Sequence, residues 1–162
     1  MITTAGGSFM PAVNNVDPMV VYDGTRWSRS ATTSTAQTIS SITRGGTGNL
    51  TATLVTASAH SLVTGNTITV AGATPAEFNG TYRITVTNAT TFTYTMATAP
   101  SGNATVMGTY TIDYFITGKN SNTFAYVNLF KERLYFVEED SLNFWYLPVD
   151  SINGAVTKFP LG

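Results

Sequence analysis

The 162-residue sequence contains no cysteine and only one histidine, His60. The lack of cysteine excludes disulfide bonds and thiolate metal sites. A metal site needs three or four ligands, and a nucleophilic triad needs a base oriented by an acid. The first carboxylate after His60 is Glu77, so the sequence provides neither arrangement. We therefore expect no enzymatic activity, no metal and no cofactor.

Charged residues are also scarce, at 10% of the chain, with a formal net charge of -1. The eight lysines and arginines are spread thinly and form no basic stripe that would neutralise phosphates, so we expect no sequence-specific binding of nucleic acid. No run of about eighteen apolar residues occurs, and the first residues lack the pattern of a secretory signal. We expect neither membrane insertion nor signal-dependent export.

Threonine is abundant, with about thirty residues, and favours pleated, half-buried strands. We therefore predict an all-β protein, composed of a small β-sandwich or barrel module between segments that form a blade-like antiparallel meander. The first segment, residues 1–41, is predicted to be an extended arm with a β hairpin, because glycines and prolines interrupt every helical turn. Asp23-Gly24 is the expected hairpin turn.

Residues 42–112 are predicted to form the Thr-rich β domain. Large apolar residues alternate with threonines, and turn residues recur at roughly ten-residue spacing, which is typical of a small sandwich or barrel. Within this domain we assign structural turn positions to His60, Gly65, Asn79 and Gly80. A hydrogen bond from the His60 ring to turn backbone is the expected reason for that histidine.

Residues 113–162 form a third segment, in which aromatic and charged residues replace threonine. Four short apolar runs separated by turns predict a four-stranded antiparallel meander. The consecutive acidic residues Glu138, Glu139 and Asp140 are expected to form a solvated turn. Because one such sheet cannot cover both of its faces, it needs the N-terminal segment, a further blade or another chain. The predicted subunit interface consists of Tyr126, Phe130, Tyr135, Phe144, Trp145 and Tyr146.

Two longer stretches resemble known phage proteins. The segment "ATLVTASAHSLVTGNTITVAGATPAEFNGTYRITVTNATTFTYTMATAPSGNATVMGTY" resembles a small β module that recurs in bacteriophage virion proteins, with matches at His60, Thr64, Gly72, Asn79 and Thr91. The segment "RLYFVEEDSLNFWYLPVDSINGA" resembles β-propeller blades of phage tail nozzle or DNA-stabilising proteins. A full nozzle protein has several blades, whereas one is visible here, so a longer chain and a self-contained subunit both stay open.

The resemblance implies a structural protein of the virion, assembled in the host cytoplasm, with the Thr-rich module inserted between the flanking segments. It implies a homo-oligomeric ring, hexameric in the family, at the tail nozzle or head-to-tail junction, in contact with other tail or portal and adaptor proteins. We expect the ring contacts to use the N-terminal arm and the aromatic sheet. The alternative is a glycan-binding or decoration module on the virion or cell surface, with Tyr82, Tyr94, Trp27 or Trp145 stacking on sugar rings.

Overall fold

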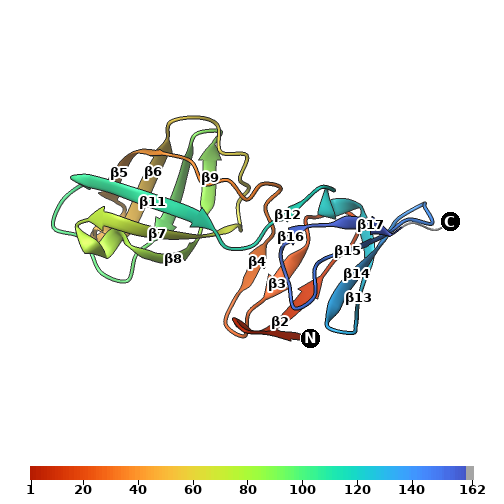
Figure 1. Ribbon diagram of the computed structural model, residues 1–162. Helices are drawn as coiled ribbons and strands as arrows, with labels where there is room; N and C mark the ends of the chain where they lie inside the picture. Colours follow the sequence, from red (N-terminus) through yellow and green to blue (C-terminus); the bar gives the residue numbers. More distant parts are fainter. Residues whose placement is uncertain (160–162) are drawn as a thin grey trace. The chain divides into compact units, whose positions relative to one another are not determined.

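The computed structural model describes residues 1–159 and is all-β, as predicted (Figure 1). Its helical segments are three-residue 3-10 turns, and none in the described part of the chain is long enough to cross a membrane. The chain divides into two compact units, residues 35–113 and residues 1–34 with the segment from Tyr114 onward. Residues 160–162, the end of the predicted third segment, lie outside the described residues.

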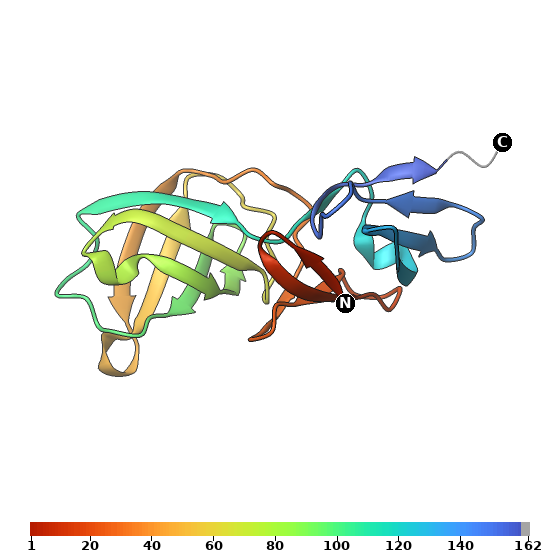
Figure 2. The same cartoon turned by 60° about the horizontal axis from the view of Figure 1, so that its bottom comes forward.

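Residues 35–113 form two antiparallel sheets, which Figures 1 and 2 show as two layers. The sheets have the strand orders β5-β6-β10-β9 and β11-β7-β8, and neither closes into a barrel. Their elements are β5 (Ile39–Gly45), η1 (Thr47–Asn49), β6 (Thr51–Thr56), β7 (Thr67–Thr74), η2 (Ala76–Phe78), β8 (Gly80–Arg83), β9 (Thr85–Asn88), β10 (Thr91–Thr95) and β11 (Val106–Ile112).

The core of this unit follows from the alternation in its strands. In β6 the side chains of Ala52 and Leu54 are buried, whereas Thr51 and Thr53 are partly exposed. Phe92 on β10 is fully buried and meets Tyr110 of the other sheet edge to face, with ring centroids 5.8 Å apart. Burying each large apolar side chain stabilises the fold by about 1.5–3 kcal/mol. A pattern of period two therefore produced both the strands and the core.

Residues 1–34 form a four-stranded antiparallel sheet, where the sequence suggested an extended arm with one hairpin. The apolar residues Ile2, Phe9, Met19 and Val21 are buried in a core shared with the C-terminal segment, and this burial stabilises the segment as strands. The predicted hairpin is β3 with β4, in which Tyr22 pairs with Trp27. The strands are β1 (Ile2–Thr4), β2 (Gly7–Ala12), β3 (Val20–Tyr22) and β4 (Trp27–Arg29).

The C-terminal segment contributes a four-stranded antiparallel meander with the order β13-β14-β15-β17. Phe124 and Phe136 stack at 4.6 Å between centroids on its inner face, and both are fully buried in the core shared with the N-terminal sheet. A short parallel pair joins β12, which precedes the meander in sequence, to β16, which lies between β15 and β17. The elements are β12 (Ile116–Thr117), η3 (Ser121–Thr123), β13 (Phe124–Phe130), β14 (Arg133–Glu138), β15 (Phe144–Tyr146), β16 (Gly154–Ala155) and β17 (Thr157–Phe159).

Candidate functional site

The outer face of the meander carries several exposed aromatic side chains close together. Because successive side chains of a strand point to opposite faces, Phe136 of β14 is buried while Tyr135 points outward. The outward side chains line a shallow hollow of about 270 Å³. Its lining residues are Tyr126, Asn128, Phe130, Tyr135, Val137 and Phe144. We refer to this surface, extended by Tyr146, as the outer aromatic face.

The rings on this face contact each other across the strands. Tyr146 lies 6.0 Å from Tyr135 and 6.4 Å from Phe159, measured between centroids. The Arg133 guanidinium lies 4.8 Å from the centre of the Tyr146 ring, a cation–π contact. Tyr126 and Phe130 are 71% and 59% exposed. Aromatic and arginine side chains of this kind are the residues that carry most of the binding energy at protein interfaces.

Trp145 lies on the opposite face from the other five residues of the predicted interface. It pairs with Phe136 in the sheet register and packs against the core of its unit. Its indole Nε1–H donates to Glu138 Oε2 at 3.0 Å. The structure thus brings together Tyr126, Phe130, Tyr135, Phe144 and Tyr146. It separates Trp145 from them, because successive side chains of β15 point to opposite faces of the sheet and Trp145 lies between Phe144 and Tyr146.

Glu138, expected in a solvated turn, instead ends strand β14 with its side chain only 14% exposed. Lys119 forms an ion pair with Oε1, and Asn143 Nδ2–H donates to Oε2 at 3.0 Å. The hydrogen bond from Lys119, followed by that from Trp145, lowers the pKa of Glu138 to about 2. Glu139 and Asp140 are exposed. Sequence reasoning missed this cluster because Lys119 and Asn143 come from separate segments.

His60 is buried, with 2% of its surface exposed. Its Nδ1 accepts a hydrogen bond from the Leu62 backbone N–H at 3.0 Å, which assigns the proton of the neutral ring to Nε2. The ring packs edge to face on Phe92 at 5.3 Å. Burial lowers the pKa of His60, since a charged ring would lose its hydration. The imidazole therefore connects a loop to the core.

The other predicted turn positions lie in two connections of the same unit. Gly65 has a φ of 100°, and its N–H donates to the Ile84 carbonyl at 2.9 Å. The Asn79 side chain makes two hydrogen bonds to the backbone of Ala73. Gly80 has a φ of 146°, a backbone conformation that residues other than glycine rarely adopt. These contacts are all within the fold of residues 35–113.

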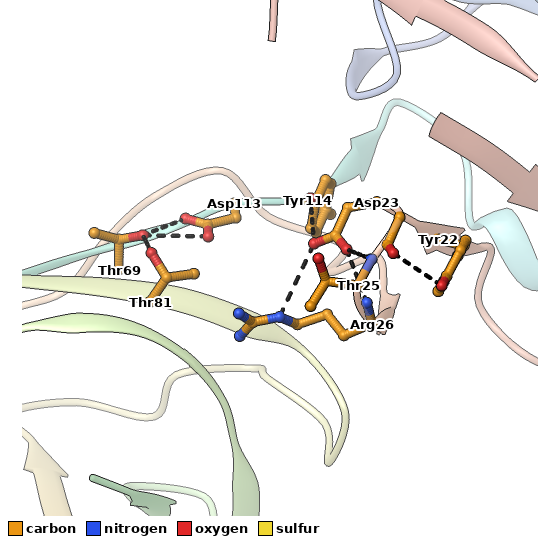
Figure 3. A network of polar contacts seen from close by, with 9 residues as sticks. Tyr22, Asp23, Thr25, Arg26, Thr69, Thr81, Asp113 and Tyr114 are labelled. Carbon is orange, nitrogen blue, oxygen red and sulfur yellow. Dashed lines mark hydrogen bonds and ion pairs between the residues drawn. The ribbon is translucent and has the colours of Figure 1, made fainter. Parts of the chain in front are cut away.

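Asp23 organises the β3–β4 turn in the unit that contains residues 1–34 (Figure 3). Its Oδ1 accepts hydrogen bonds from the backbone N–H groups of Thr25 and Arg26, both at 2.8 Å. Burial opposes the ionisation of Asp23, but the hydrogen bonds from Arg26 and Thr25 outweigh it and lower the pKa. Tyr114 also donates its hydroxyl to Oδ2 at 3.5 Å. Asp23 thus acts as a turn-stabilising carboxylate.

Asp113 forms a separate polar contact at the end of residues 35–113. The Thr69 hydroxyl lies 2.9 Å from Asp113 Oδ1 and 3.2 Å from Oδ2, and 2.9 Å from the Thr81 hydroxyl (Figure 3). Among the described residues, no group of three or more His, Asp or Glu side chains could hold a metal ion. These carboxylates therefore have structural partners within their own units.

The aromatic residues considered for sugar stacking lie in different environments. Tyr94 is 3% exposed, stacks on Tyr82 at 4.3 Å and donates its hydroxyl to the Phe78 carbonyl at 3.1 Å. Trp27 is 43% exposed and lies 5.2 Å from Tyr22. Tyr94 is thus a core residue, whereas the outer aromatic face offers several exposed rings in one place.

Comparisons with protein-family models, with curated proteins and with solved structures find no match to this chain.

Proposed function

We propose that this chain is a structural component of a bacteriophage virion, at the tail nozzle or head-to-tail junction, where copies of it assemble into a ring. The observation that carries the proposal is the outer aromatic face. Five aromatic side chains lie on one side of a single sheet, next to a sixth ring, Phe159, and the other side of this sheet is filled by the core. Exposed apolar surface of this kind marks a site of protein association.

The likeness of residues 52–110 to a virion β module and of residues 133–155 to nozzle blades supports the phage assignment. The virion, reached by assembly in the host cytoplasm, is the corresponding location. The sequence also suggested ring contacts through the N-terminal arm. Ile2, Phe9, Met19 and Val21 of that segment are buried in the core of their own unit, so the proposed contacts use the outer aromatic face. A ring follows when one face binds a different surface of the next copy and the rotation closes.

The size of the assembled full chain in solution tests this proposal. We expect the wild-type chain to form discrete oligomers by sedimentation velocity and rings by negative-stain electron microscopy. The double variant Tyr126→Ser with Phe130→Ser should reduce oligomer formation at least tenfold. The matched control is Val63→Ser with Val106→Ser, which replaces two residues that are 42% and 53% exposed in the other unit. A wild-type chain that stays monomeric at all concentrations would refute ring assembly by this chain alone.

The second candidate is a glycan-binding or decoration module, favoured by the hollow on the same face. Tyr126, Tyr135 and Phe144 offer rings for stacking on sugars, and the Asn128 amide offers a donor and an acceptor. Binding of the full chain to a glycan array, abolished by Tyr135→Ala and kept by the Val63→Ser control, would select this function. Oligomers without glycan binding would select the first.

A further inference from the structure

Three side chains donate to the carboxylate of Glu138. Lys119 Nζ contacts Oε1, while Asn143 Nδ2 and Trp145 Nε1 both contact Oε2 at 3.0 Å. Lys119 follows β12, Glu138 ends β14, and Asn143 lies in the turn before β15. The cluster thus joins an amine, a carboxamide and a carboxylate from three points of one unit.

An amine and a carboxamide can react to form a secondary amide bond. A carboxylate that contacts both groups can transfer the protons in this reaction. Both donor nitrogens hydrogen-bond to Glu138, so Lys119 Nζ and the side-chain carbonyl carbon of Asn143 are separated by roughly two hydrogen-bond lengths and the width of a carboxylate. Lys119 has a flexible four-carbon side chain, and the reaction requires its Nζ to move from Glu138 to the Asn143 carbonyl carbon. We propose that Lys119 and Asn143 form an intramolecular isopeptide bond, with Glu138 transferring the protons.

The proposed reaction is balanced without any further reagent. A Lys119 amine that has lost its ammonium proton to water attacks the Asn143 side-chain carbonyl carbon to form a C–N bond. In the tetrahedral centre, Glu138 takes one proton from the attacking nitrogen and passes it to the original amide nitrogen, which leaves as ammonia when its C–N bond breaks. The products are one secondary amide between the two side chains, one molecule of ammonia and the regenerated carboxylate.

The cluster is partly shielded from solvent. The Trp145 ring covers the amine, with Lys119 Nζ 5.7 Å from the ring centre, and Trp145 packs against the core. The side chains of Lys119 and Glu138 are 27% and 14% exposed. Asn143 is held by backbone contacts as well, since its carbonyl accepts from the Glu138 N–H at 3.2 Å and its N–H donates to Ser141 Oγ at 3.1 Å. The electrophile is therefore fixed beside the catalyst.

A bond between Lys119 and Asn143 would tie the segment before β13 to the β14–β15 turn. A covalent tie of this kind restricts the unfolded chain and resists pulling on the meander. Because the ion pair is the resting state and attack needs the free amine, we expect the bond to form slowly and to form faster at about pH 9 than at pH 7.

Intact-mass spectrometry of the purified full chain tests the proposal. Loss of ammonia makes the bonded chain about 17 Da lighter than its sequence mass, as the nucleophilic mechanism requires. Trypsin does not cleave after an acylated lysine, so the peptide map should show residues 84–131, uncut at Lys119, joined to residues 134–158. A chain with the full sequence mass after prolonged incubation at about pH 9 would overturn the proposal.

Variants distinguish the isopeptide bond from other losses of ammonia. Lys119→Arg keeps the positive charge beside Glu138 but has no nucleophilic amine, so the mass loss and the joined peptides should disappear. Lys131→Arg, at an exposed lysine outside the cluster, should leave both unchanged. Asn143→Asp should lose about 18 Da, as water, if the same carbon is attacked. A mass loss that persists in Lys119→Arg would come from cyclisation at an Asn-Gly sequence such as Asn153-Gly154 and would contradict the proposal.

Discussion

The side chain of Asn79 binds the backbone of Ala73 at both of its hydrogen-bonding groups. The Ala73 N–H donates to Asn79 Oδ1 at 2.8 Å, and Asn79 Nδ2–H donates to the Ala73 carbonyl at 2.8 Å. In an antiparallel sheet, a residue of the neighbouring strand pairs with a residue in the same way, through one N–H donor and one carbonyl acceptor. One side chain thus takes the place of a strand at the end of β7, where η2 interrupts the sheet.

Asn79→Asp should destabilise residues 35–113 by about 2–3 kcal/mol, since the carboxylate keeps the acceptor but loses the donor and then faces the Ala73 carbonyl. The free energy of unfolding in urea measures this effect. Asn88→Asp is the matched control, because Asn88 uses only its Oδ1, as an acceptor for Thr90. Equal stability of the two variants would show that the Asn79 donor contributes nothing.

Gly108→Ala should destabilise the chain by at least about 3 kcal/mol. Gly108 has a φ of 65°, and a Cβ there would overlap the Ala71 carbonyl oxygen and lie 2.6 Å from the Ala73 nitrogen. Because these are backbone atoms of β7, they cannot move aside without breaking the β7–β11 pairing. Gly102→Ala, with nothing within 4 Å, should change stability by less than about 0.5 kcal/mol. Thermal melts of the two variants give the comparison, and similar melting temperatures would contradict it.

Acid should weaken the wild-type fold through His60. The pKa of this ring is lowered in the folded chain, so the folded ring stays neutral while the unfolded ring takes up a proton below its ordinary pKa of 6.5. The stabilisation is therefore complete above pH 6.5 and is lost as the pH falls through the folded-state pKa, with a slope of at most about 1.4 kcal/mol per pH unit. Urea unfolding between about pH 7.5 and pH 5 follows this dependence.

His60→Asn should remove this slope while lowering the free energy of unfolding at neutral pH by about 1–3 kcal/mol, because the packing on Phe92 is lost. The carboxylates with lowered pKa values, Asp23 and Glu138, have ordinary values of 3.8 and 4.5 and stay ionised in this range. A variant with the same slope as the wild type would assign the pH dependence to other groups.

Inner and outer residues of the meander should separate stability from assembly. Phe136→Ala removes a ring that stacks on Phe124 in the core and should cost about 3–5 kcal/mol. Phe144→Ala removes an outer ring that is 38% exposed and should cost less than about 1.5 kcal/mol. If the proposed ring forms, Phe144→Ala should weaken it, as measured by sedimentation at equal protein concentration. A Phe144→Ala variant as unstable as Phe136→Ala would place that ring in the core.

Trp145→Ala belongs with the inner residues. Its ring packs against the core and its indole donates to Glu138, so the variant should lower the free energy of unfolding by about 2–4 kcal/mol. Denaturant unfolding of the isolated chain measures this loss without reference to assembly. Full stability of the variant would return Trp145 to the predicted interface.

The all-β class and many strand positions follow from the sequence because they depend on local pattern. The alternation around Ala52 and Leu54 and the apolar runs from Phe124 onward are strands in the structure. Period two places large side chains on one face whatever the sheet packs against. The Asp23-Gly24 pair likewise predicted its hairpin from backbone preferences alone.

What the N-terminal segment packs against could not be read from its residues. Glycine and proline exclude helix over residues 1–34, but they do not distinguish an extended arm from a sheet. Ile2 and Phe9 become core residues only because the C-terminal segment, more than a hundred positions away, supplies Phe124 and Leu134. The partners of Glu138 are closer in sequence, but Lys119 and Asn143 meet it through the folding of the connections around β13 and β14, which the strand pattern does not specify.

By itself, the sequence determined the all-β class, the alternating strands and the supply of aromatic residues for a surface. The tertiary structure alone decided which rings are outside, because the parity of β15 exposes Phe144 and Tyr146 and turns Trp145 inward. It also brought the side chains of Lys119 and Asn143 into contact with the Glu138 carboxylate. Local patterns fix which way each side chain points along its own strand, whereas contacts between distant segments depend on how the sheets pack.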